Sequence, residues 1–101
     1  MRRGTTPTIV FTLPFNVSEI NNVEIYFSQD DELLLTKTMD ECVLAGNTIT
    51  VTLSQQDTLA LDELKTEIQV RFMFNDGSVE ATGTAKTKIQ KILKDGEIYG
   101  N

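Results

Sequence analysis

An alternation of apolar and polar side chains between Thr66 and Phe74 constrains the fold more than any other feature of the chain. Every second position carries a β-branched or aromatic side chain: Ile68, Val70, Phe72 and Phe74. Successive side chains of a strand point to opposite faces, so this run predicts a β-strand with one buried face. It ends at residues 75–78 (NDGS), where Asp-Gly predicts a tight hairpin turn with positive backbone angles. A last strand is expected from Val79 to about Ile89.

The same period of two recurs in three other segments, at residues 8–13, 23–27 and 47–53, and a further strand is expected at residues 33–38 (LLLTKT) as the second arm of a hairpin. Pro14 ends the first of them, because proline has no amide hydrogen to give to a ladder. An acidic turn at residues 29–32 (QDDE) lies between residues 23–27 and 33–38 and predicts a hairpin. We expect the face of residues 66–74 to pack against the inward side chains of these segments, which are Phe11, Ile25, Ile49 and Val51.

One short helical turn is expected near residues 55–60. Ser54 followed three residues later by Asp57 has the spacing of a capping box, in which each side chain bonds to the other residue's backbone amide. Short strands with one helical crossing predict an all-β fold, a compact antiparallel β-sandwich of the immunoglobulin-like class with about six to seven strands. The cysteine pair and tryptophan of antibody domains are missing, and a small barrel stays open as the alternative.

Length and charge limit the domain organisation and the partners. A chain of 101 residues predicts one domain over residues 1–101, with a basic arm at residues 1–5 and a tail at residues 95–101 as flexible ends. The formal charge of −6 argues against nucleic acid as a partner. Thr12 and Pro14 interrupt the first apolar run, so no signal peptide is expected, and no apolar stretch is long enough to span a membrane.

The residue types needed for the common enzyme mechanisms are scarce. The chain has no histidine and one cysteine, so a nucleophile would depend on lysine or a carboxylate as its base. The acidic neighbours of Cys42 raise a thiol's pKa, so a buried or half-buried structural cysteine is expected. A single cysteine cannot form an intramolecular disulfide, which favours a reducing compartment. We therefore expect no enzyme activity.

Clusters of charge and isolated glycines have plain structural interpretations. Three acids at residues 30–32 are too few for a calcium loop and predict a solvated hairpin tip. A glycosidase needs two carboxylates at a fixed separation. Nothing in the sequence fixes the distances within the group that could suggest one, which is Asp57, Asp62, Glu63 and Glu67. Gly83 stands alone and predicts a bulge, with no phosphate-binding glycine motif near it. We expect no cofactor, no metal and no small-molecule substrate.

The lysines near the C-terminus allow two interpretations. Lys86, Lys88, Lys91 and Lys94 could form a basic patch for a membrane surface. Lysines on an exposed strand also prevent sheets from joining edge to edge, and this second interpretation is the one we favour. No membrane partner is expected.

Four stretches of the chain resemble a known family. RRGTTPT, FTLPF, GNTITVTLSQ and ILKDG are similar to segments of small proteins encoded in phages and prophages of Gram-positive gut bacteria. The resemblance implies a non-enzymatic structural accessory of the virion, tail or baseplate with an immunoglobulin-like fold. It implies other phage subunits or further copies as partners, with synthesis in the bacterial cytoplasm and later residence in the virion. GEIYGN extends past the familiar ending, and its role is open.

Two functional hypotheses follow. The first is a structural or assembly module of a phage particle that acts by protein-protein contacts; the alternative is a soluble module that recognises a host protein or surface ligand. Arginines in the arm are too few to bind nucleic acid but could pair with carboxylates at a free strand end, and ordinary surface solubility explains them equally well. Ends of a chain often become ordered on binding. The candidate partner contacts are therefore Arg2, Arg3, Glu97 and Tyr99.

Overall fold

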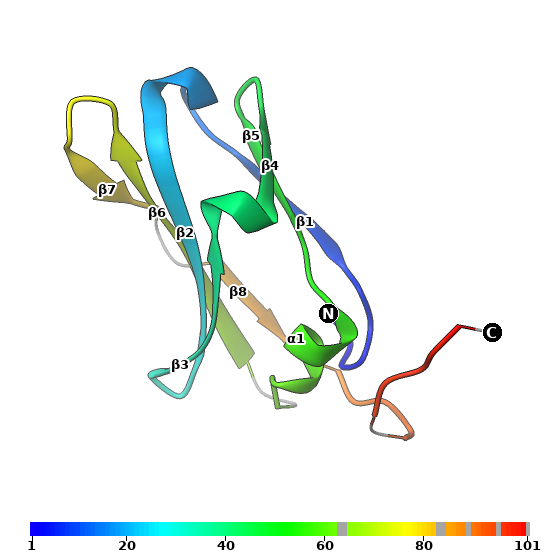
Figure 1. Ribbon diagram of the computed structural model, residues 1–101. Coiled ribbons are helices and arrows are strands. Elements are labelled where there is room, and N and C mark those ends of the chain that lie inside the picture. The colour runs from blue at the N-terminus through cyan, green and yellow to red at the C-terminus, as the bar shows by residue number, and fades with distance from the viewer. Residues whose placement is uncertain (63–64, 83–84, 89, 95, 101) are drawn as a thin grey trace.

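The computed structural model contains two antiparallel sheets packed face to face (Figure 1). It describes residues 1–62, 65–82, 85–88, 90–94 and 96–100. The elements in chain order are β1 (Thr8–Thr12), η1 (Val17–Glu19), β2 (Ile20–Gln29), β3 (Glu32–Thr38), η2 (Met39–Glu41), β4 (Cys42–Ala45), β5 (Thr48–Thr52), α1 (Gln55–Leu59), β6 (Lys65–Phe74), β7 (Val79–Ala81) and β8 (Ala85–Lys88).

The smaller sheet has the order β1-β5-β4, and the larger has the order β3-β2-β6 with both β7 and β8 paired to the far side of β6. Every pairing between these strands is antiparallel. The predicted all-β antiparallel sandwich with one short helical turn is thereby confirmed. The described residues form eight strands rather than six to seven, because β4 was not expected and the last strand is divided.

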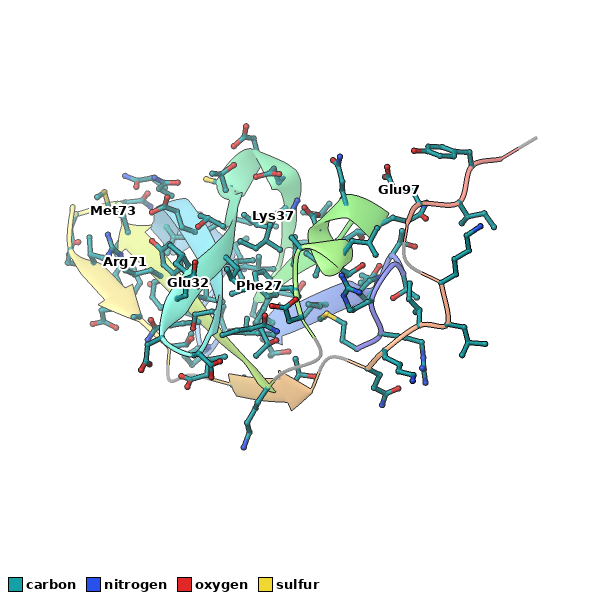
Figure 2. All side chains as sticks on the ribbon, turned by 90° about the horizontal axis from the view of Figure 1, so that it is seen from below. Phe27, Glu32, Lys37, Arg71, Met73 and Glu97 are labelled. Atoms are coloured by element: carbon teal, nitrogen blue, oxygen red, sulfur yellow. The ribbon has the colours of Figure 1, made fainter. Side chains whose placement is uncertain are left out.

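The core lies between the sheets and is built from the faces that the alternation predicted. Ile25, Phe27, Ile49 and Val70 are fully buried, and Figure 2 shows Phe27 between the layers. Phe72 packs edge-on against two half-buried rings, with centroids 5.1 Å from Phe15 and 5.4 Å from Phe74. Such aromatic pairs stabilise a core beyond the area they bury. The predicted inward faces are therefore correct.

The last strand, expected from Val79 to about Ile89, is interrupted at Thr82, which belongs to neither β7 nor β8. Arg71 stands opposite Ala81 in the β6·β7 ladder, whereas Ile68 stands opposite Ala85 in the β6·β8 ladder. Between these pairs β6 has two residues and the partner segment has three, so the registers differ by one residue. Thr82 lies at this step and accepts the Val70 amide with its side-chain oxygen at 3.1 Å. An extra residue in one strand is the definition of a β-bulge; Gly83, where a bulge was predicted, lies outside the described residues.

Two hairpin turns differ in how they reverse the chain. Asp30 and Asp31 form a two-residue turn with φ of 49° and 63°, and both side chains are exposed, as predicted for a solvated tip. At residues 75–78 only Gly77 has a positive φ, of 90°. The Gly77 amide donates to the Phe74 carbonyl, and the Phe74 amide donates to the Ser78 carbonyl. The turn there is a three-residue loop with glycine at its last position, and Asp76 does not share the positive angle we expected.

The α1 helix crosses from β5 of the smaller sheet to β6 of the larger one, and its predicted capping box is confirmed. Ser54 Oγ accepts the Asp57 amide at 3.0 Å, and Asp57 Oδ2 accepts the Ser54 amide at 2.9 Å. The same carboxylate lies 2.7 Å from Lys37 Nζ on β3. Asp57 therefore both caps the first turn of the helix and attaches the helix to the larger sheet.

Candidate functional site

The residues considered for catalysis have structural roles. Cys42 is half-buried against the core and donates to the Thr38 carbonyl. Burial and the nearby Glu41 raise the pKa of its thiol, so the thiolate is disfavoured at neutral pH. Asp57 is the capping residue and ion-pair partner of Lys37, and Glu63 lies outside the described residues. Across the ranges that the structure describes, no three or more Cys, Asp or Glu side chains cluster closely enough to hold a metal ion.

The candidate contact residue Arg3 holds the end of α1. Its Nε and Nη2 donate to the carbonyls of Leu61 and Leu59, each at 2.8 Å. The last carbonyls of a helix have no partner within the helix, and a cation there also interacts favourably with the helix dipole. The guanidinium thus binds backbone carbonyls at the helix end, a partner that the sequence did not suggest.

Arg2 joins the two ends of the chain. Its Nη1 donates to the Lys91 carbonyl and its Nη2 donates to Gln90 Oε1, both at 2.7 Å. The backbones of Arg2 and Gln90 form a parallel bridge, with amides on both sides donating across it. Gly4 is packed so closely that a Cβ added there would lie 2.9 Å from Ile92 Cδ1. The N-terminal arm is therefore attached to the segment that follows β8.

The C-terminal segment is held at its backbone and exposed at its side chains. The Gln55 amide group donates to the Ile98 carbonyl at 2.9 Å and accepts the Ile98 amide at 2.7 Å, as the edge of a neighbouring strand would. Leu93, Ile98 and Tyr99 have exposed fractions of 99%, 80% and 78%. The Tyr99 hydroxyl donates to Glu97 Oε2 at 3.0 Å, and this bond raises the pKa of the tyrosine.

These segments together form one surface, which we call the terminal junction: residues 1–5, 55–61, 90–94 and 96–100. Figure 1 shows the N-terminus, α1 and the C-terminal segment at the same end of the molecule. In Figure 2, Glu97 lies at this end, whereas Arg71 and Met73 lie at the other. The α1 helix links the two halves. Arg3 binds the carbonyl of its last residue, Leu59, and that of Leu61 just beyond it, whereas Gln55 at its first position binds the backbone of Ile98 in the tail.

Four residues of the terminal junction, Arg2, Arg3, Glu97 and Tyr99, were expected from the sequence, and three others that matter were not. Leu93 and Ile98 are its most exposed apolar side chains, and Gln55 fixes the tail. An apolar pair within the otherwise polar ending GEIYGN was a usable signal for Ile98 and Tyr99. The role of Gln55 had no local signal, because its partner is 43 residues away.

The opposite end of the molecule carries two hollows, an open one of about 440 Å³ lined by Glu19, Phe74, Asn75, Asp76 and Ser78, and a smaller one on the larger sheet. The volume of the smaller hollow is about 50 Å³, and its walls include Glu24, Arg71 and Met73. The Arg71 guanidinium lies 5.9 Å from the centre of the Tyr26 ring, and the Tyr26 hydroxyl donates to Glu24 at 2.8 Å. Ligand pockets usually enclose several hundred Å³, so the smaller hollow is too small for a small-molecule site.

None of the helices in the described ranges is long and apolar enough to cross a membrane. No protein-family model matches the chain, and no curated protein matches it either.

Proposed function

We propose that the protein is a non-enzymatic assembly module of a phage or prophage particle, associated with its tail or baseplate, and that it binds another structural subunit through the terminal junction. The observation that carries this proposal is the exposure of Leu93, Ile98 and Tyr99 near the C-terminus, where Gln55 holds the backbone of Ile98. Apolar and aromatic anchors that fill pockets on a partner supply most of the binding energy of protein interfaces. The phage context rests on the resemblance of the chain's four stretches to phage-encoded proteins.

The contacts within the junction favour binding by a preformed surface. Arg2 and Arg3 attach the arm to the body of the protein, so the tail is presented by a rigid support. Binding costs less when the binding groups are already ordered. Two arginines and Lys91 at this end of an acidic protein also favour a partner whose apolar pocket has an acidic rim.

The test is to count the protein in particles. Particles would be purified from a host that expresses either the wild-type protein or the variant Leu93→Ser/Ile98→Ser/Tyr99→Ser, and the copies per particle would be measured by quantitative mass spectrometry. We expect the variant to keep its melting temperature and to fall by about tenfold or more in copy number, since anchors dominate binding. Val79→Ser, at a half-exposed site outside the junction, is the matched control and should be incorporated normally.

Two results would refute the proposal. Normal incorporation of the triple variant would remove the junction from the interface. Absence of the wild-type protein from particles, together with capture of a host protein by the same junction, would instead support the alternative of a soluble module that recognises a host protein or surface ligand.

A further inference from the structure

Charge is divided unequally between the two sheets. The strands of the smaller sheet read TIVFT, CVLA and TITVT and contain no charged residue. The strands of the larger sheet carry acids and bases throughout, among them Glu24, Lys37 and Arg71. The outer face of the smaller sheet exposes Val10 at 57% and Val43 at 67%, flanked by threonines. In a protein of charge −6, this sheet is where a second acidic molecule meets the least repulsion.

The edge of this sheet at β1 has backbone hydrogen-bonding groups with no partner among the residues that the structure describes. Within the β1·β5 ladder the Leu53 amide donates to Pro7, and the Leu13 amide donates to Asn47. Hydrogen-bonded and non-hydrogen-bonded pairs alternate along an antiparallel ladder. The backbone amides and carbonyls of the odd-numbered residues of β1 therefore point toward β5. The amides and carbonyls of Thr8, Val10 and Thr12 therefore point away from the sheet, at the outer edge that β1 occupies in Figure 1.

Edges of this kind are usually protected, and the edges of this fold at β3 and β4 are. Charged side chains and bulges discourage a strand from pairing with another molecule. Edge strand β3 contains Glu32 and Lys37 and lies beside a register shift at Phe27. The β4 edge follows Asp40 and Glu41 directly, so two copies paired there would bring like charges together. β1 has no charge and no bulge along its five residues.

We propose that β1 pairs with β1 of a second copy of the chain, antiparallel about a two-fold axis at Val10, and that the two smaller sheets thereby form one continuous six-stranded sheet. The sequence TIVFT is nearly a palindrome. In this register Val10 faces the other Val10, and each Thr8 faces Thr12 of the second copy. All three outward residues of both strands then exchange their amide and carbonyl bonds. A two-fold interface must be self-complementary in this way.

Edge pairing over five residues buries less than the roughly 800 Å² per partner of a stable interface, so the dimer forms in a concentration-dependent way. Sedimentation of the purified full chain from micromolar to millimolar concentration would measure it. Val10→Lys places two lysines on the axis and should weaken association by about tenfold or more. Thr52→Lys puts the same charge on the exposed face of β5, away from the axis, and should retain the dimer.

Cross-linking tests the register separately. In a Cys42→Ala background, Val10→Cys places two thiols across the axis, where paired Cα atoms are about 5.5 Å apart and can form a disulfide. Thr8→Cys is the control, because in this register its two copies are about 14 Å apart. We expect a disulfide dimer from the first variant and at least about tenfold less from the second.

A monomer at every concentration, a dimer unaffected by Val10→Lys, or equal cross-linking of the two cysteine variants would overturn the proposal. The inference does not depend on the proposed function. It is tested on the purified protein with changes in β1, whereas the proposed function is tested in particles with changes in the tail, so either can fail alone.

Discussion

Replacing Lys37 by methionine tests how α1 is attached to the larger sheet. The ammonium lies 2.7 Å from Asp57 Oδ2 and 3.2 Å from Glu41 Oε2. The exposed fractions of the side chains are 11% for Lys37 and 15% for Asp57, against 45% for Glu41. The Lys37–Asp57 pair is therefore the shielded one, and it connects two elements that are distant in sequence.

The expected magnitude follows from this partial burial. Exposed ion pairs contribute about 0.2–1 kcal/mol to stability, and breaking a fully buried pair costs about 3–5 kcal/mol. Both members of the Lys37–Asp57 pair are partly shielded from solvent, so we expect Lys37→Met to lower the free energy of unfolding by about 1–2 kcal/mol, between these two limits. Urea unfolding at neutral pH measures this change, with the exposed Lys65→Met as the control.

The pH dependence of the stability lost in Lys37→Met tests whether the loss is electrostatic. Burial alone would raise the pKa of Asp57, but hydrogen bonds from Lys37 and Ser54 outweigh it and hold the pKa below 3.8. A carboxylate with a lowered pKa contributes stability above its unfolded pKa and loses it as the pH falls through the folded value. Burial lowers the pKa of Lys37, but its bonds to Asp57 and Glu41 outweigh this and raise it above 10.5, so its contribution is lost at still higher pH.

The stability difference between the wild-type protein and Lys37→Met should therefore be largest between about pH 5 and 10, and it should shrink as the pH falls below 3.8, the ordinary pKa of the Asp57 carboxyl. A double-mutant cycle with Asp57→Asn, which keeps an acceptor for the Ser54 amide, should give a coupling energy of about 1 kcal/mol. A coupling energy near zero, or a stability difference that is the same at pH 3 and pH 7, would refute the electrostatic argument.

Three further substitutions test other parts of the fold. Phe72→Ala should lower the free energy of unfolding by about 3–5 kcal/mol in urea titrations, since the ring is buried in the aromatic cluster; a change under about 1 kcal/mol would contradict the core assignment. Gly77→Val should cost about 1–3 kcal/mol, because valine is strained at a φ of 90°, and an unchanged melting temperature would argue for a different turn. Cys42→Ala should leave particle incorporation intact; its loss in a folded variant would reopen the enzyme hypothesis.

Local sequence predicted the buried faces well because the period of two has a direct physical cause. Ile25, Ile49 and Val70 are fully buried, as their alternation with polar residues indicated. The Ser54 and Asp57 capping box also depends only on neighbours along the chain, and it was found at the predicted place. Both features can be identified from a few consecutive residues.

Features that depend on pairing between distant segments were not predictable in the same way. The division of the last strand follows from the register of β7 and β8 against β6, and the Thr82 hydroxyl that replaces a backbone acceptor there is 12 residues from Val70. Strand β4 is only four residues long, too short for alternation to stand out. Its hairpin with β5 nevertheless had a signal in Gly46-Asn47, a dipeptide typical of a two-residue turn, and Gly46 has a φ of 58°.

The candidate site shows the same limit more strongly. The two arginines at the start of the chain suggested a contact surface. In the structure they donate to backbone carbonyls 56 to 89 residues away, and Arg2 also donates to the Gln90 side chain. Backbone carbonyls leave no trace in a sequence, since every residue has one. The sequence therefore indicated that the arm contains contact residues, but it could not predict that they bind the end of α1.

The two proposed interfaces are compatible because they use different parts of the chain. The β1 edge begins at Thr8, beyond the arm at residues 1–5, and the exposed anchors of the terminal junction lie on residues 93–99. A two-fold dimer through β1 would carry two terminal junctions. Two linked sites bind more tightly than one when the geometry allows both to be occupied. Weak pairing at β1 would then be reinforced wherever neighbouring sites on a particle hold two copies close together, which is the condition that assembly provides.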